Sequence, residues 1–479
     1  MKRIIFPSPA AIVGIAGLLF AGGCRIPKPE GQVSLPPLPD RFVFQSDTMP
    51  IRLPGWKALL TDPGVQACID TALQVHPLAR HARWEVLAQQ SVMGGLQGAT
   101  QPMAGWGATS SLRKFGLYTM DGAGNATTDI RPGKIVPEHL PDFLMGFQSS
   151  WETDLAGQIK NRKKAALRRW EASQEGENWF KTQWISKIAC QFVEVRSLEK
   201  ELEVLGRYLQ LQQEALELVR LQKLAGKANE LAVKQMEAQL EDIRGSQIEL
   251  GFRKKEALLE IQRLSGKVGP VTQPIQWSMP DSLPLQISTV TPRFMLERRP
   301  DLKQARRLLE ASGYDLEEAR RMFYPNLSLQ ANLGQQAFRP DFLLQFPTSL
   351  AYMAAAGISG PLVNRKALKA GYSMARARKM QALAEFHHVS NEAYLEVSGL
   401  LALEQSLREA WTVKSREVAI LQSSRELAIS LFAAGSATYL EVVLSQQQVL
   451  NAERQRVHLQ KAFLQNQICL YKAVGGGVL

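Results

Sequence analysis

The histidines are the first residues to test for catalysis or metal binding, because they titrate near neutral pH and ligate metals. His76 and His81 are five residues apart, a spacing that places them poorly on one helix face. His387 and His388 are adjacent and would diverge by about 100° on a helix. The sequence contains no HExxH, GxSxG or Walker phosphate-binding pattern. We therefore predict a protein that is not an enzyme and that uses no metal and no cofactor.

Cys24 is the residue with the clearest chemistry, since its thiol is placed to accept a lipid. A basic start, Met1 to Arg3, precedes an apolar run that ends in small residues directly before Cys24. This arrangement resembles a bacterial lipoprotein signal, in which the cysteine becomes the acylated first residue of the mature chain. An ordinary signal peptide with an incidental cysteine is the alternative. No Asp stands beside Cys24, so retention in the inner membrane is not signalled and the outer membrane is favoured.

Three further cysteines, Cys68, Cys190 and Cys469, fall in segments that we expect to be helical. None has CxxC spacing, and an odd count argues against a disulfide framework in an oxidising compartment. We interpret them as buried helix cysteines.

The formal charge of +12 raises the question of nucleic-acid binding. The 57 basic residues are spread along helices among 45 acidic ones, and no compact basic block interleaved with aromatics occurs. We therefore predict no nucleic-acid partner.

The chain matches itself in three places. Pro77 and Pro102 recur 223 residues later as Pro300 and Pro325, and the tripeptide that starts at Asn161 recurs 203 residues later. Five spaced residues between Gly226 and Gln239 recur 209 residues later, between Gly435 and Gln448. Each half therefore has the order short helix, polar stretch, long helix, tight turn and return helix. We interpret this pattern as a duplicated domain.

Proline divides each half sharply. None occurs between Pro141 and Pro270, nor after Pro361. Within the first of these spans, a hydrophobic seam follows 4-3-4-3 spacing with one polar exception: Leu198, Leu202, Leu205, Leu209, Gln212, Leu216 and Val219. Such spacing predicts coiled-coil helices, which here would form two long antiparallel hairpins over about 158–265 and 365–474.

Four shorter segments alternate apolar and polar residues, which is typical of membrane β-strands of about 10 residues. We expect these strands at about 103–113, 143–152, 326–336 and 348–360. Half of a soluble sheet would give the same local pattern. Four strands cannot close a barrel, and an open edge in lipid would leave backbone groups unsatisfied. Three chains would give a shared twelve-stranded barrel and a twelve-helix tube, so the expected assembly is a homotrimeric conduit.

Several short motifs, in order along the mature chain, carry a resemblance to a known family. They are Asp62-Pro63 with Pro77, the run from Trp151 to Gly157, Arg298-Arg299-Pro300-Asp301, Phe323-Tyr324-Pro325, and the ending from Leu470 to Gly477. The chain resembles the outer-membrane efflux lipoproteins of the TolC/OprM family, NodT class, which serve tripartite RND-type pumps. The resemblance implies a mainly helical fold with membrane β-structure. It also implies a trimeric exit duct for small molecules such as drugs or toxic compounds, with a periplasmic adaptor and an inner-membrane transporter as partners.

The two hairpin tips are the best candidate sites. Leu224, Ala225, Gly226 and Lys227 form the first tip, and Ala434, Gly435, Ser436 and Ala437 form the second. A glycine at each tip would end a helix in the left-handed conformation. Turn formation alone would explain both glycines, whereas in the resembled family such tips contact the adaptor. The nearest carboxylates, Glu230 and Glu441, are candidate gate residues of the periplasmic end, with solvated helix faces as the alternative.

The predicted domain limits are a signal peptide at 1–23, a Pro-rich lipid-anchored tether at 24–55, a first repeat at 56–265, a linker at 266–292 and a second repeat at 293–479. The tether, the linker and the C-terminal stretch would form a belt around the tube. Two other functions share parts of this pattern. One is a TolC-like exit channel for type I protein secretion, and the other is a lipid-anchored periplasmic coiled-coil adaptor or scaffold.

Overall fold

The computed structural model describes residues 27–28, 39–43, 53–267, 280, 283, 291–361 and 366–476. These residues are mainly helical and include one four-stranded sheet. They divide into two compact units. The first contains residues 89–170 and 308–383, and the second contains residues 53–88, 171–307 and 384–476. Cys24, Asn364, Arg365 and most of the 266–292 linker lie outside the described residues.

Proline and short polar side chains set the starts of the shorter helices. In α3 (Pro63–Val75), the Asp62 carboxylate accepts a hydrogen bond from the Val65 backbone N–H at 2.9 Å. Thr291 caps α8 (Pro292–Arg298) in the same way. These caps satisfy backbone donors that lack a partner within the helix, and proline at the first turn has no N–H to satisfy. Three other helices outside the long hairpins are α2 (Trp56–Leu59), α4 (Pro77–Gly98) and α9 (Pro300–Arg321).

The sheet is antiparallel, with the strand order β1-β4-β5-β6. Its strands are β1 (Met103–Lys114), β4 (His139–Thr153), β5 (Asn326–Ala337) and β6 (Leu350–Ser359). The bounds fall close to those expected, except that β4 begins four residues earlier than predicted. Alternation alone misses that start because Leu140, Pro141 and Asp142 interrupt the apolar pattern.

The segment between β1 and β4 contains regular structure that the sequence did not predict. It forms α5 (Met120–Thr127) and a small hairpin of β2 (Asp129–Arg131) and β3 (Lys134–Ile135). The Thr119 hydroxyl caps α5 by accepting from the Gly122 N–H at 3.1 Å. The corresponding connection between β5 and β6 holds only α10 (Pro340–Leu343).

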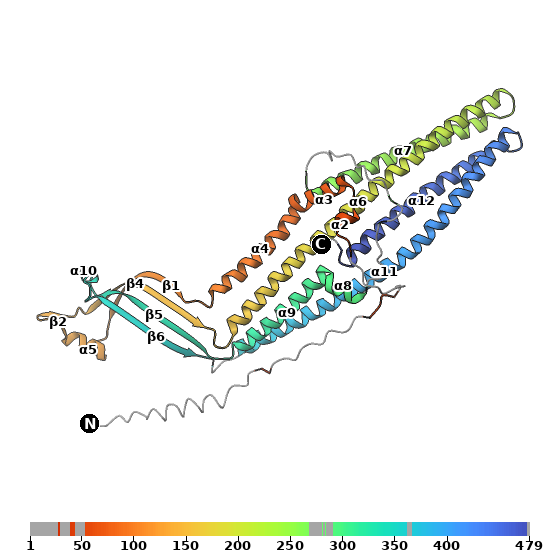
Figure 1. The fold of residues 1–479 in the computed structure, drawn as a ribbon. Helices are drawn as coiled ribbons and strands as arrows, with labels where there is room; N and C mark the ends of the chain where they lie inside the picture. Colours follow the sequence, from red (N-terminus) through yellow and green to blue (C-terminus); the bar gives the residue numbers. More distant parts are fainter. Residues whose placement is uncertain are drawn as a thin grey trace. The chain divides into compact units, whose positions relative to one another are not determined.

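Two helical hairpins make up most of the chain (Figure 1). The first pairs α6 (Gln158–Leu224) with α7 (Glu230–Ser265), and the second pairs α11 (Lys366–Ala433) with α12 (Tyr439–Ala473). With 67 and 68 residues, α6 and α11 are each about 100 Å long. No helix among the described residues is long and apolar enough to cross a membrane.

The predicted hydrophobic seam lies inside the first hairpin. Leu205, Leu216 and Val219 are at most 5% exposed, and Leu216 and Val219 pack against Val233 and Met236 of α7. The polar exception is explained by a partner. The buried Gln212 amide donates to the Gln239 side-chain oxygen of α7 at 2.9 Å. The apolar period therefore identified the packing face correctly.

Candidate functional sites on the sheet and at the hairpin tips

One face of the sheet is apolar and exposed. Trp106, Phe147, Leu333 and Tyr352 are consecutive cross-strand partners, so they form a row over all four strands. Their exposed fractions are 81%, 69%, 53% and 81%. Successive residues of a strand point to opposite faces, so residues two positions away extend this row. Met145, Leu350, Ala331, Ala354, Leu329 and Ala356 share the same face, which we name the apolar sheet face.

The opposite face is polar and carries small residues. Gln148 and Asn332 are partners across β4 and β5, and the Gln336 amide donates to the Asp142 carboxylate at 2.9 Å. Gly146 faces Gly334 directly. A Cβ at Gly146 would lie 2.3 Å from the Gly334 Cα, so this close approach of two strands requires glycine. The sheet therefore separates an apolar surface from a polar one.

The sheet has two open edges. β1 and β6 end the strand order, and among the described residues each pairs with a neighbouring strand on one side only. A long edge strand presents a row of backbone N–H and C=O groups that can pair with another chain. An exposed apolar face combined with two open edges is an incomplete surface.

Each hairpin tip is built by a left-handed glycine. Gly226 has φ 70° and Gly435 has φ 73°. In the first tip the Lys227 N–H donates to the Gln222 carbonyl at 2.8 Å, and in the second the Ser436 N–H donates to the Leu431 carbonyl at 2.9 Å. The Gly226 N–H also donates to the Lys223 carbonyl, and the Gly435 N–H donates to the Phe432 carbonyl, each at 3.0 Å. Together these bonds form the usual glycine-terminated helix end. The sequence predicted this conformation correctly.

The two tips differ in what they expose. Seven of the eight predicted tip residues are exposed and Ala437 is half-buried. Leu224 is 85% exposed in the first tip, together with the Lys227 ammonium, whereas the second tip offers only Ala434, Gly435 and Ser436. The return helices begin at different caps. The Asn229 side chain accepts from the Ala232 N–H at 2.9 Å, and Thr438 forms a capping box with Glu441.

Both candidate gate carboxylates have local partners. Glu230 forms an ion pair with Lys223, and this hydrogen bond lowers the pKa of the exposed Glu230 carboxyl below its ordinary value. The Glu441 carboxylate accepts from the Thr438 backbone N–H at 2.6 Å and so completes the start of α12. Capping therefore accounts for Glu441 within a single chain, and its role as a gate residue stays a prediction.

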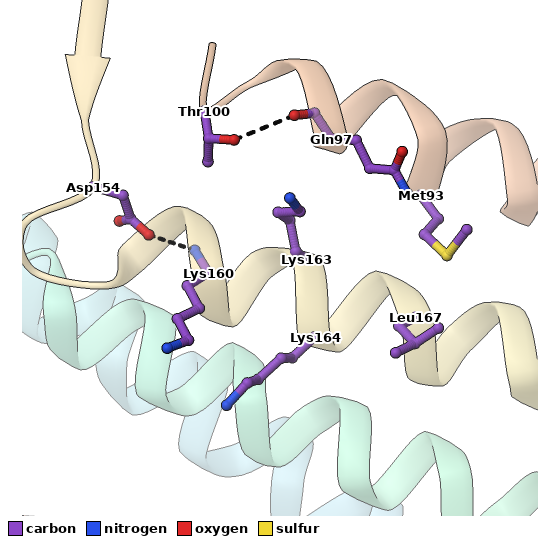
Figure 2. A pocket seen from close by; sticks show the side chains of 8 residues that line it. All are labelled: Met93, Gln97, Thr100, Asp154, Lys160, Lys163, Lys164 and Leu167. Atoms are coloured by element: carbon purple, nitrogen blue, oxygen red, sulfur yellow. Dashed lines mark hydrogen bonds between the residues drawn. The ribbon is translucent and has the colours of Figure 1, made fainter.

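A pocket of about 510 Å³ lies in the first unit, between the end of α4 and the start of α6 (Figure 2). Its lining combines two apolar side chains, Met93 and Leu167, with three lysines, Lys160, Lys163 and Lys164. The only acidic lining residue, Asp154, accepts from the Lys160 N–H at 2.7 Å and from the Ile159 N–H at 2.9 Å. Its carboxylate therefore caps α6, and the lining provides no acid–base pair for catalysis.

Residues 292–476 match the sequence model of the outer membrane efflux protein family. The chain is 24% identical over 476 residues to the Cation efflux system protein CusC of Escherichia coli O6:H1, covering 98% of this chain and 99% of that protein. It is 22% identical over 471 residues to the Probable outer membrane lipoprotein SilC of Salmonella typhimurium, with 97% and 98% covered. A crystal structure of CusC matches with a TM-score of 0.81 and 23% identity, covering 93% of this chain and 99% of that one.

Residues 292–476 are therefore similar to the outer membrane efflux protein family, and the chain resembles CusC and SilC over nearly its full length. The names of these relatives describe efflux-system and outer-membrane components rather than enzymes, which is consistent with the expectation of no catalysis. The matched family region begins at Pro292, and the two-repeat domain limits stay a prediction.

Sequence reasoning missed a set of buried charges between the two hairpins. Glu201 of α6 is 1% exposed and contacts Arg454 of α12 at 2.7 Å and His458 at 3.6 Å. Burial opposes ionisation of Glu201, but the interactions with His458 and Arg454 outweigh it, so the pKa of Glu201 is lowered. On α12, Glu453 is 3% exposed and accepts from Gln422 at 2.6 Å. Charged residues on helices usually face solvent, so these were not singled out from the sequence. Their partners lie far away in the chain, and a single sequence gives no sign of such pairs.

Proposed function

We propose that three copies of this chain form an outer-membrane channel, the exit duct of a tripartite efflux pump. The observation that carries the proposal is the apolar sheet face, exposed over all four strands of a sheet with two open edges. In water, exposure of Trp106, Phe147 and Tyr352 is unfavourable by roughly 25 cal/mol per Å² of apolar surface. Lipid removes that cost.

Edge closure requires more than one copy. In the hydrocarbon core every backbone polar group needs a partner within the protein, so β1 and β6 cannot stay open there. Bacterial single-chain barrels start at eight strands. Pairing of β6 with β1 of the next copy, repeated three times, closes twelve strands. The polar face with Gln148 and Asn332 then lines the lumen.

The helical hairpins would continue the conduit through the periplasm. Each copy contributes α6, α7, α11 and α12, so that three copies supply twelve long helices. At about 100 Å, α6 and α11 have the length required to cross a wide aqueous compartment. The domain limits at 56–265 and 293–479 as two repeats, with 266–292 as a linker in a belt around the tube, are part of this proposal.

The hairpin tips are the proposed docking surface for a periplasmic adaptor. The exposed small residues around Gly226 and Gly435 allow another helical tip to approach closely, while Leu224 offers an apolar contact. An inner-membrane RND-type transporter would supply the energy, and this chain would conduct its substrate passively. Glu230 and Glu441 are the proposed gate carboxylates at that end.

Small toxic solutes are the proposed cargo. CusC is named a cation efflux protein, and the relative TtgI of Pseudomonas putida is a toluene efflux pump outer membrane protein. Such different cargo within one fold suggests that selection occurs upstream of the duct. Type I protein secretion and a periplasmic scaffold remain the alternatives.

Acylation of Cys24 is the proposed anchor in the outer membrane. SilC is named a probable outer membrane lipoprotein, which supports this assignment. We expect metabolic labelling with a clickable fatty acid to mark the wild-type chain and to leave Cys24→Ser unlabelled. Labelling of Cys24→Ser at the wild-type level would contradict the assignment.

The test of the channel is the mass of the full chain purified from membranes in a mild detergent. We expect three chains per particle, heat-dependent migration in gels, and aggregation when the detergent is removed. A soluble monomer or dimer without detergent would overturn the channel and leave the scaffold alternative.

A further inference from the structure

Two cysteines from different hairpins meet in the second unit. Cys190 of α6 and Cys469 of α12 are both half-buried, and their thiols are hydrogen-bonded to one another. The Ser186 hydroxyl forms a second hydrogen bond to Cys190. The sequence analysis interpreted them as buried helix cysteines, and the structure places both in helices, half-buried and as free thiols.

Neighbouring contacts hold the two thiols in register. Glu201 contacts Arg454 at 2.7 Å, and Glu194 contacts Lys461 at 3.1 Å. One turn nearer the start of α6, the Gln465 amide donates to the Cys190 carbonyl at 3.3 Å. These three contacts move back along α6 as they move forward along α12, as expected for antiparallel helices. Cys469 lies one turn beyond Gln465 on α12, so both cysteines lie beside the same contact line.

The environment of the pair suits disulfide chemistry. Burial opposes ionisation of both thiols, whereas their mutual hydrogen bond favours a thiolate on one of them. The Lys472 ammonium lowers the pKa of both thiols. A thiolate is the nucleophile in disulfide exchange, and we take Cys469 as the attacking sulfur and Cys190 as the resolving one.

We propose that Cys190 and Cys469 form a disulfide in the mature protein, which ties the first hairpin to the second. The inference rests on the proposed function, because the oxidising periplasm is the compartment in which such a bond persists.

The oxidant is a protein disulfide of the thiol–disulfide oxidase class. The Cys469 thiolate attacks one sulfur of that disulfide, forms a mixed disulfide and releases the oxidant's other sulfur as a thiolate. The Cys190 thiol then loses its proton to solvent and attacks the Cys469 sulfur, which displaces the second oxidant thiolate. Two thiols are oxidised by two electrons, and one oxidant disulfide is reduced to a dithiol.

The tie would lie far from the tips. Cys190 precedes the end of α6 by about 50 Å of helix, and Cys469 follows the start of α12 by about 45 Å. The disulfide would fix the two hairpins to one another near their bases and leave the tips free to separate.

The test uses full-length protein taken from membranes, with free thiols alkylated before the protein is unfolded and digested with trypsin without reductant. We expect peptide 188–196 to be linked to peptide 462–472 as the main form of both. Cys190→Ser should release Cys469 for alkylation. Cys68→Ser is the matched control, because Cys68 is also a half-buried helix cysteine, and it should leave the link intact.

Recovery of peptides 188–196 and 462–472 as separate, alkylated species would overturn the inference. So would the finding that the two thiols are reduced and together bind one copper(I) ion. The mass of the same sample in detergent separates the two proposals. A trimer with two alkylated thiols refutes the disulfide and leaves the channel intact, whereas linked peptides in a soluble monomer support the disulfide and refute the channel.

Discussion

Replacement of Phe147 by arginine is expected to abolish the membrane-inserted trimer while leaving the single chain able to fold. Phe147 is 69% exposed, so its side chain contributes little to packing within one chain. It lies near the middle of β4 and in the centre of the apolar sheet face. Arginine on the lipid side of a barrel costs about 2–4 kcal/mol at the bilayer midplane.

Three copies multiply this cost. The trimer would lose about 6–12 kcal/mol, and even the lower value shifts an equilibrium by roughly four powers of ten. Gln148→Arg adds the same charge one residue away on the polar face, and it should leave the trimer intact. The assay is the fraction of protein that migrates as a heat-sensitive trimer after extraction from outer membranes. Equal trimer yields from Phe147→Arg and Gln148→Arg would refute the assignment of the two faces.

Two further changes test the tips and the buried charges. Gly435→Val should cost about 1–2 kcal/mol, because a β-branched residue is strained at φ 73°. Gly435→Val should reduce efflux-dependent growth without loss of trimer. The control Gly399→Ala, within α11, should leave growth unchanged. Unchanged growth in Gly435→Val would show that the second tip is not part of the docking surface. The lowered pKa of Glu201 means that its charged form stabilises the fold above the ordinary carboxyl pKa, and this contribution is lost as pH falls through the lower, folded-state pKa. Thermal unfolding between pH 3 and 7 should therefore show a smaller acid-side loss in Glu201→Gln than in wild type, and parallel profiles would contradict this reasoning.

Local periodicity was enough to predict the long helices and the four strands of the sheet. The 3.5-residue spacing of Leu205, Leu216 and Val219 identified the packing face of α6, and the alternation in β5 identified the apolar sheet face. Gly226 and Gly435 marked the helix ends because the left-handed conformation favours glycine. These patterns depend only on residues that are near one another in the sequence, so they can be recognised from a single sequence.

Contacts between distant segments could not be predicted. Nothing near Glu201 distinguishes it from a solvated helix carboxylate, and its burial depends on Arg454 and His458, more than 250 residues away. Cys190 and Cys469 are separated to a similar degree. The small hairpin of β2 and β3 was missed because strands of three and two residues are too short for alternation to register.

The hydrogen bond between buried Gln212 and half-buried Gln239 has a consequence for the length of the first hairpin. Leucine seams tolerate axial sliding by a heptad, because one leucine replaces another in each layer. A slide here would separate the two amides and leave the buried Gln212 amide without Gln239, at a cost of about 1–3 kcal/mol. The hydrogen bond between the two amides thus fixes the axial register of α6 against α7. It sets how far the tip at Gly226 reaches, and three copies that share it would present their tips at one height.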